Sequence, residues 1–464
     1  MADRLHDNAL IAALERAPSG GPAWLDALRD EASRTVRESG LPGRKTEAWR
    51  FTPVGDLVAL PFEQAPAPAP ATTGRRAPET APGGRPGDDG TWRLRVEGGR
   101  PRLDLAGAAP AGVVVRSIAE VLAAPDDPLA APLREHLGRL APATHFSALN
   151  TALFEDGVVL HLAKGASAAA PVHLVYAPAS SATDGPPTVA YPRVLVLAEQ
   201  GSRLTLVESF PAGSASPDGP SCGDEPAGES APRHLDNLVT ELVLGPGARV
   251  DHIRVHEAPD FVISRTIVRE ARDAHYTSRV VSLAGALMRA DLHVLLDGPG
   301  AECELDGAYV AGGRDKLDHH TLVEHRSPHC TSRQNYRGVL DDKALGVFDG
   351  IVIVHRDAQK TEAHQENRNL LLSASATVHT KPHLEIDADD VICTHGATVG
   401  SLDEDQLFYL RARGLDEATA RAILTYAFVR SVVDDIGLQP LRDRLARALL
   451  HRMPEGEALE EMTA

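Results

Sequence analysis

The sequence is poor in aromatic residues and cysteines and has no long apolar run. Aromatic residues make up 4% of its 464 residues, and its four cysteines, at positions 222, 303, 330 and 393, form no CxxC pair. Scattered cysteines in so long a chain argue against a disulfide framework. The N-terminal stretch MADRLHDNALIAALERA lacks the apolar run of a signal peptide, and no stretch of about 18 apolar residues is present to span a membrane. We therefore expect a reduced, cytoplasmic protein that is not embedded in a membrane.

Positive charge is also scarce. Lys and Arg number 47 against 65 Asp and Glu, which gives a net charge of −18 and argues against a nucleic-acid partner. The sequence contains no HExxH helix, and its GxSxG match, GPSCG at 219–223, lies in a Pro/Gly-rich segment without the strand and helix of a nucleophile elbow. GLPGRKT at 40–46 has too few residues between its glycines for a phosphate-binding loop. These absences exclude several common hydrolase and nucleotidase classes, while 43% apolar residues suffice for a large core.

Helical periodicity marks both ends of the chain. Apolar residues recur at helical spacing in 8–17 and 22–40, and 113–155 is mainly helical in pattern. After Gly400, a cap at Ser401 or Asp403 and a stop at Gly414 predict one helix. Two more helices follow, the last with Pro440 in its first turn. The apolar face expected for the middle helix consists of Ile423, Leu424, Ala427, Phe428, Val432 and Val433.

Between these ends, short β-rich runs follow one another from about Val158 to Gly400. Glycine-marked corners such as LGPGARV and LDGPGAEC favour a coiled β-solenoid, in which each rung is buried only by its neighbours. A β-sandwich remains the alternative, because no crisp numerical repeat is present.

The chain accordingly divides into three parts. Residues 1–155 form an N-terminal, mainly helical region, 156–400 a β core, and 401–464 a C-terminal helical domain. Two Pro/Gly-rich segments, 64–90 and 211–232, cannot bury enough apolar surface to fold and are predicted linkers or surface inserts. Cys222 lies in the second insert, which makes it a poor candidate for a preorganised site.

The sharpest candidate site lies in DDVICTHGATVG, residues 389–400. On a strand, Cys393 and His395 point to the same face about 6.6 Å apart. A thiolate and an imidazole so placed can share iron, zinc or a sulfur species, although two ligands alone do not close a site. A buried cysteine acting as a small apolar residue is the alternative. Asp389 and Asp390 offer carboxylates, but turn capping explains them equally well.

Two further polar stretches are dense in side chains that bind metals or hydrogen-bond. The stretch 318–330 holds His319, His320, Glu324, His325, His329 and Cys330. Its spacing matches no zinc signature, so polar ladders between rungs explain it as well as a metal site does. The stretch 355–373 holds Gln359, Gln365, Asn367 and Asn369. We interpret these amides as structural ladders or turn caps.

Several long motifs stand out in the chain: HHTLVEHRSPHCTSRQNYRGVLDDKALGVFDG, DAQKTEAHQENRNLLLS, KPHLEIDADDVICTHGATVGSLDEDQLFYLRARG and GRKTEAWRFTPV. Together they resemble motifs of the SufB/SufD family of iron–sulfur cluster assembly scaffolds. The match is dense from about 280 to 440, recurs at 43–54, and is weak across the two inserts. Gly396 in CTHGAT stands where SufB-like chains usually have glutamate, which places the resemblance on the SufD side of the family.

The resemblance implies a mainly β fold, a right-handed parallel β-helix core flanked by N- and C-terminal helical regions. It also implies a non-catalytic scaffold subunit that pairs with a SufB-like subunit through the β-helix end and binds a SufC-like ABC ATPase through its C-terminal helices. His395 would act at the shared interface, with Cys393 as its neighbour. The implied cargo is a transient iron–sulfur cluster or iron shared with SufB, with no tightly bound cofactor. Whether the isolated chain forms a homodimer is left open.

Two other classes of function stay in consideration. A β-helix enzyme acting on polysaccharide would need stacking aromatic residues, which are scarce here. A stand-alone metalloprotein would use the histidines of 318–330 and would hold metal without a partner.

Overall fold

The computed structural model describes residues 5–68, 90–104, 106–178, 185–212, 233–454 and 456. Most of the two predicted inserts, together with Cys222, lies outside the described residues. Within the described ranges, none of the helices combines the length and apolar character needed to cross a membrane.

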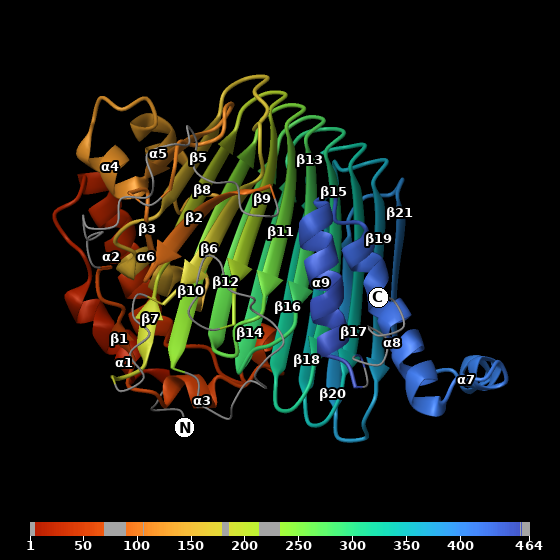
Figure 1. The fold of residues 1–464 in the computed structure, drawn as a ribbon. Helices are drawn as coiled ribbons and strands as arrows, with labels where there is room; N and C mark the ends of the chain where they lie inside the picture. The colour runs from red at the N-terminus through yellow and green to blue at the C-terminus, as the bar shows by residue number, and fades with distance from the viewer. Residues whose placement is uncertain are drawn as a thin grey trace.

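Two sheets of mostly parallel strands form the body of the molecule, and from β8 to β21 successive strands alternate between them (Figure 1). Sheet A contains β4 (Val114–Ser117), β5 (Val158–Leu162), β8 (Arg193–Ala198), β10 (His234–Leu244), β12 (Phe261–Glu270), β14 (Leu287–Leu296), β16 (Lys316–His325), β18 (Leu345–Val354) and β20 (Thr377–Ile386), with β1 (Glu63–Gln64) and β7 (Thr188–Ala190) beside them. Sheet B contains β2 (Trp92–Glu97), β3 (Arg100–Pro101), β6 (Val172–Ala177), β9 (Arg203–Phe210), β11 (Arg249–His256), β13 (His275–Ser282), β15 (Glu302–Ala311), β17 (Thr331–Leu340), β19 (Glu362–Leu371) and β21 (Ile392–Gly400). The predicted parallel β-helix with flanking helices is confirmed.

The core of this β-helix consists of side chains that stack in line from rung to rung. In sheet A, one inward row runs through Val268, Val294, Val323, Val352 and Leu384. The first four are almost completely buried, whereas Leu384 lies in β20 and is partly exposed because no further rung covers it. Each rung therefore buries the apolar face of the one before it, and the last rung leaves its own inward face uncovered.

The corners between strands depend on glycine where the backbone of one rung touches the next. A Cβ at Gly298 would lie 2.0 Å from the backbone nitrogen of Arg272 in the preceding rung. Gly300, at the same corner, has a φ of +74°, which an L side chain rarely adopts. The corner LDGPGAEC thus turns the chain as its sequence predicts.

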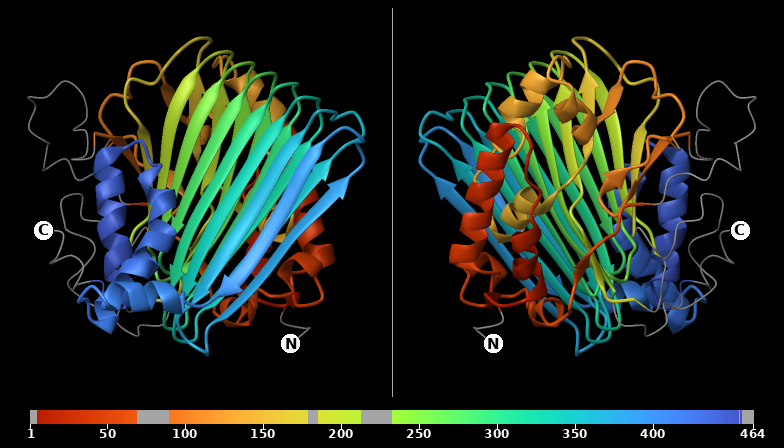
Figure 2. Two further views of the ribbon diagram at one scale, coloured as in Figure 1. Left: turned by 90° about the vertical axis from the view of Figure 1, so that its right-hand side faces the viewer. Right: turned by 90° about the vertical axis from the view of Figure 1, so that its left-hand side faces the viewer.

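The N-terminal helices cover the outer face of sheet A at its first rungs (Figure 2). They are α1 (Ala9–Ala12), the 3₁₀ turn η2 (Ala13–Arg16), α2 (Ala23–Ser39), the 3₁₀ turn η3 (Glu47–Trp49), α3 (Gly55–Val58), α4 (Ile118–Ala123), α5 (Ala130–His136) and α6 (His145–Leu153). In α6, Asn150 donates to the backbone oxygens of Pro192, at 2.8 Å, and Asn237, at 2.6 Å. These bonds satisfy a carbonyl just before β8 and one in β10, between the parts of β10 that pair with β7 and with β8, and they fix the helix on the sheet.

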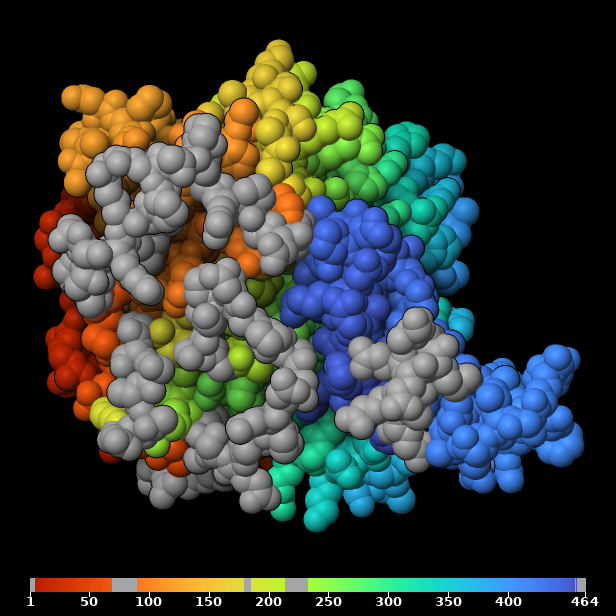
Figure 3. Space-filling model, in the orientation of Figure 1, coloured from red at the N-terminus to blue at the C-terminus, as the bar shows by residue number. Residues whose placement is uncertain are grey.

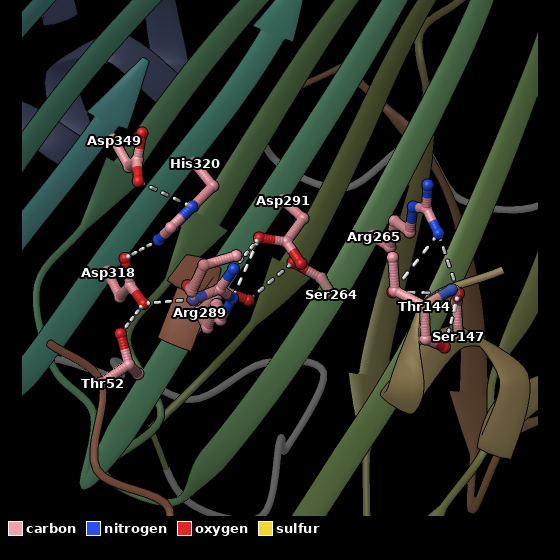
Figure 4. A network of polar contacts seen from close by, with 11 residues as sticks. Thr52, Thr144, Ser147, Ser264, Arg265, Arg289, Asp291, Asp318, His320 and Asp349 are labelled. Atoms are coloured by element: carbon pink, nitrogen blue, oxygen red, sulfur yellow. Dashed lines mark hydrogen bonds and ion pairs between the residues drawn. The ribbon is translucent and has the colours of Figure 1, made fainter. Parts of the chain in front are cut away.

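A short N-terminal segment, residues 47–52, lies across the later strands of sheet A, and we call it the clasp. The buried guanidinium of Arg289 donates to the backbone oxygen of Ala48 at 2.8 Å and lies 3.9 Å above the ring of Trp49. The same guanidinium pairs with the buried Asp318 at 2.9 Å, and Thr52 donates to that carboxylate (Figure 4). The clasp is thereby tied to β14 and β16 by charged groups that are out of water.

The clasp also reaches the last strand of sheet A. Glu47 pairs with Lys381 of β20 at 2.9 Å, and the ring of Phe51 stacks on His379 with centroids 4.2 Å apart. Because Lys381 and its partner are largely exposed, their pairing adds little stability. These contacts nevertheless place the motif GRKTEAWRFTPV against the rung that ends the β-helix.

The C-terminal helices α7 (Glu404–Arg411), α8 (Glu417–Asp434) and α9 (Gln439–His451) follow the last strand, and α8 and α9 pack on the outer face of sheet B (Figure 2). As predicted, Asp403 caps α7, Gly414 ends it with a φ of +97°, and Pro440 occupies the first turn of α9. In α8, two members of the predicted apolar face, Val432 and Val433, are buried. Ala427 is exposed, so the prediction is wrong for that residue.

Arginine side chains join the C-terminal helices to the β-helix. Arg337 of β17 donates to the backbone oxygen of Phe428 at 2.9 Å, and Arg444 of α9 pairs with Glu257 at 2.8 Å. In contrast, α7 projects away from the body of the molecule (Figures 1 and 3). The helical domain therefore has one anchored part and one projecting part.

A carboxylate under α8 makes this docking dependent on pH. Burial is the main reason that the pKa of Asp306, on β15, is raised to about 6; Asp435 and Glu304 add to the rise, and Arg279 and Arg337 oppose it. The unfolded chain holds this carboxyl at a pKa of about 3.9. Stability is therefore lost as the pH rises from about 4 to about 6 and stays lower above that range.

We expect Asp306→Asn to stabilise the protein at pH 8 by about 1–2 kcal/mol, or a few degrees in Tm, because the amide removes the buried charge. The gain should shrink as the pH falls through 6 and vanish near pH 4. Thermal unfolding of both proteins across this range measures the difference. An equal gain at pH 4 and pH 8 would show that packing, not ionisation, is responsible.

Candidate functional site

The β-helix has one uncovered end, formed by β20 and β21. Each strand is the last of its sheet, so within the described part of the chain one of its edges has no strand beside it. Nearly every residue of β21 is exposed. The end also exposes large apolar side chains: Ile386 at 42%, Ile392 at 59% and Val399 at 49%. An exposed apolar face beside two free strand edges is characteristic of a surface that another chain covers.

Cys393 and His395 lie in β21, on its inward side. Cys393 is paired in register with Ala363 and His395 with Gln365, both of which are buried inside the β-helix. Paired residues of parallel strands point to the same face, so both side chains project toward the lumen from the uncovered rung. His395 is exposed and Cys393 partly buried. The sequence prediction that they share one face agrees with this register.

The two groups differ in readiness to bind a metal. Partial burial raises the pKa of the Cys393 thiol, and a hydrogen bond from the backbone of Ala363 opposes that rise only in part. The imidazole of His395 makes no hydrogen bond or ion pair with any residue that the structure describes. A free imidazole with a neighbouring thiol supplies two ligands, so further ligands must come from another molecule.

The two acids before the strand are not equivalent. Asp390 pairs with Lys360, and its backbone nitrogen donates to the side chain of Gln359 at 2.9 Å. Asp390, in the corner between β20 and β21, is therefore bonded to the corner between β18 and β19 in the preceding rung. Asp389 is exposed.

Beneath His395, buried amides form a ladder. Gln365 donates through Nε2 to Oε1 of Gln334 at 3.3 Å, and the hydroxyl of Thr321 donates to that same oxygen at 2.7 Å. A second amide pair, Asn369 and Asn367, is joined at 2.6 Å. The structural role predicted for the 355–373 amides is thus confirmed. The sequence alone does not place Gln365 directly below His395, because that pairing depends on the register between β19 and β21.

The histidines of 318–330 do not converge. Because β16 alternates its side chains, His319 points into the lumen, where it lies 3.1 Å from the hydroxyl of Ser282, while His320 points outward to Asp318 at 2.9 Å. Burial lowers the pKa of His319 to about 3 and that of His325 to about 4, so both are neutral. Among the described residues, no three His, Cys, Asp or Glu side chains are grouped to hold a metal ion.

A second exposed feature lies on α7. Phe408 is 74% exposed and Tyr409 55% exposed. Tyr409 lines a shallow hollow together with Leu410 of the same helix and Leu424 of α8. Within the described ranges, these are the only aromatic side chains among the strongly exposed large apolar residues. Their position on a projecting helix suits a protein contact and not a sugar-binding platform along a sheet, which disfavours the polysaccharide alternative.

Comparisons with known proteins give matches that cover most of the chain. Residues 179–428 match a family model described as SUF system FeS cluster assembly, SufBD core domain. The chain is 31% identical over 453 residues to an iron-sulfur cluster assembly SufBD family protein of Synechocystis sp., which covers 96% of this chain and 95% of the relative. It is 30% identical over 444 residues to protein ABCI7, chloroplastic, of Arabidopsis thaliana, covering 94% of this chain and 88% of that protein. The iron-sulfur cluster assembly protein SufD of Escherichia coli is 29% identical over 420 residues, 90% of each chain.

Proposed function

The chain belongs to the SufBD family of SUF iron–sulfur cluster assembly proteins, and from this premise we propose that it is a SufD-type, non-catalytic scaffold subunit. In this proposal it pairs with a SufB-like subunit through the β20–β21 end and binds a SufC-like ABC ATPase through its C-terminal helices. The observation that carries the proposal is the uncovered last rung, which presents His395 and Cys393 at an unpaired strand edge. The proposed location is the cytoplasm, which suits the free thiols of Cys303, Cys330 and Cys393.

The two edge strands differ in how well they could accept a partner strand. Natural edge strands are often protected by proline, lysine or a bulge. β20 contains Lys381 and Pro382, whereas β21, with the sequence ICTHGATVG, contains neither residue type. We therefore place the main backbone pairing of the SufB-like subunit, or of a second copy in the isolated chain, along β21.

The cluster or its iron is cargo in this proposal and is bound only between subunits. His395 and Cys393 supply an imidazole and a thiol from this chain, and the partner supplies the remaining ligands. A cluster held by mixed ligands at a separable interface is more easily released than one held by four cysteines of one chain. Such lability suits a scaffold that must pass its product on, and no tightly bound cofactor is needed.

The ATPase contact is proposed to centre on α7. Exposed aromatic side chains on a projecting helix are the typical anchors of protein interfaces. Replacing Phe408 and Tyr409 with serine should weaken ATPase binding by about 2–4 kcal/mol, or roughly 30- to 1000-fold, with little change in Tm. Titration of the purified chain with a SufC-like ATPase measures this loss. Unchanged ATPase affinity in the double variant would show that α7 is not the centre of the ATPase contact.

Co-purification from cells tests the whole proposal. A tagged copy of the full chain should bring down both a SufB-like and a SufC-like protein. Ile392→Lys with Val399→Lys places charges at the uncovered end and should remove the SufB-like protein alone, since α7 is untouched. The α7 double variant should remove the ATPase alone. If the unmodified chain brings down neither protein, the scaffold role is wrong.

A further inference from the structure

The amide ladder under the open end has one unused acceptor. Gln365 is 3% exposed, and among the residues that the structure describes its Oε1 has no hydrogen-bond partner. Its Nε2 is already directed at Oε1 of Gln334, which also accepts from Thr321. The other unpaired amide group of the ladder, Nε2 of Gln334, does not bond to this oxygen. Because the donor end of the Gln365 amide points down the ladder, its free oxygen is left for a group outside the ladder. A buried carbonyl oxygen without a donor is costly and is rarely retained without a use.

The lumen makes specific room for this amide. A Cβ at Gly350 of β18 would lie 2.1 Å from Nε2 of Gln365. Gln365 therefore extends across the lumen over a position that only glycine leaves open. The next rung pairs Gly350 with Pro382 and Gln365 with His395. Of these two, only His395 has a side chain that can donate a hydrogen bond.

We propose that Gln365 is a positioning residue for His395, accepting a hydrogen bond at Oε1 from one imidazole N–H. Neighbouring parallel strands are about 4.8 Å apart, so side chains paired in register are within reach of each other. The ring is exposed and has no other partner in the described part of the chain, which leaves it free to turn toward the amide. The role of His395 in cluster assembly rests on the proposed function. The hydrogen bond between Gln365 and His395 does not depend on that function.

The bond would define which ring nitrogen is available to the cargo. A neutral imidazole has one N–H and one lone pair, and the nitrogen that donates sets the tautomer. With one N–H held by Gln365, the other nitrogen carries its lone pair and is directed away from the ladder. Metal-binding histidines are commonly oriented in this way by an acceptor behind the ring. The ladder would thus present His395 to the shared interface in one tautomer and one orientation.

Nitrogen-15 NMR of the purified full chain, labelled at histidine, tests the bond directly at pH 8. The His395 signals are identified by their loss in His395→Ala. In the unmodified chain these signals should show one predominant neutral tautomer. In Gln365→Leu they should show the mixture of two neutral tautomers that is expected of an unrestrained imidazole. Gln365→Glu keeps an acceptor at the same place and should restore one tautomer. Asn369→Leu is the matched control, because this buried amide on the same strand bonds to the Thr398 backbone and should leave His395 unchanged.

Cluster formation in cells provides the second measurement. Gln365→Leu should lower maturation of iron–sulfur enzymes by about 10-fold, and Gln365→Glu should recover most of it. An unchanged His395 tautomer in a folded Gln365→Leu protein overturns the inference, even if His395→Ala abolishes maturation. The opposite result would be a changed His395 tautomer in Gln365→Leu together with normal maturation in His395→Ala. That result supports the bond and overturns the proposed role of His395. The two failures are therefore distinguishable.

Discussion

Replacing His395 with alanine is expected to abolish iron–sulfur cluster formation in cells while leaving both the fold and the complex intact. The side chain is exposed and bonds to none of the described residues, so its loss should change the free energy of unfolding by less than about 0.5 kcal/mol. The imidazole is nevertheless the most accessible metal ligand on the inward face of the last rung. The measurement is the activity of iron–sulfur enzymes in cells whose only copy of the gene carries the variant. We expect this activity to be as low as in cells that lack the gene.

A matched control comes from the neighbouring strand. His383 of β20 is also exposed, but its imidazole bonds to Glu385 on the outer face of sheet A, away from the lumen. His383→Ala should retain normal maturation. Maturation in Cys393→Ser should lie between the levels of His395→Ala and His383→Ala, because the thiol is partly buried and its raised pKa makes it the weaker ligand at neutral pH. Normal maturation of iron–sulfur enzymes in His395→Ala would show that the cluster site is not at the β20–β21 end of the molecule.

Much of this site was predictable from local pattern. The alternation of a strand places Cys393 and His395 on one face, and the glycine-marked corners predict a coiled chain. The caps and stops of the C-terminal helices were equally visible, since Asp403 and Gly414 act on their immediate neighbours. In each case the interaction that decides the structure joins residues a few positions apart.

Contacts between distant segments were not predictable in this way. Which face of β21 is inward depends on its register with β19, and therefore so does the position of Gln365 below His395. On α8, Ala427 is exposed although it fits the apolar pattern, because the helix packs between sheet B and its neighbouring helices and buries Ala420 and Val429 instead. Thr52 and Asp318 are 266 residues apart, and nothing local to either indicates their bond. Resemblance identified the motif around Thr52, but only the structure supplies its physical role.

That role leads to the second large effect, which is expected at Arg289. Its buried guanidinium pairs with Asp291 and Asp318, each at 2.9 Å (Figure 4). The same guanidinium also contacts Ala48 and Trp49 of the clasp. Arg289→Leu should destabilise the protein by about 3–5 kcal/mol, since it leaves the buried Asp318 carboxylate without its arginine partner. We expect Tm to fall by about 5–10 °C and the clasp to become sensitive to protease. Thermal unfolding and limited proteolysis with N-terminal sequencing measure the two effects.

The charge on Asp318 decides whether this loss comes from an unpaired ion or from poorer packing. Burial opposes ionisation of Asp318, but the nearby charges of His320 and Arg289 outweigh burial and hold its pKa well below the usual range. A depressed pKa stabilises the fold above about pH 3.9, the value in the unfolded chain, and this contribution is lost as the pH falls. Arg289→Leu combined with Asp318→Leu should therefore recover part of the lost stability, and its unfolding should depend less on pH in acid. If the double variant is less stable than Arg289→Leu alone, the pair stabilises the clasp through shape and not through charge.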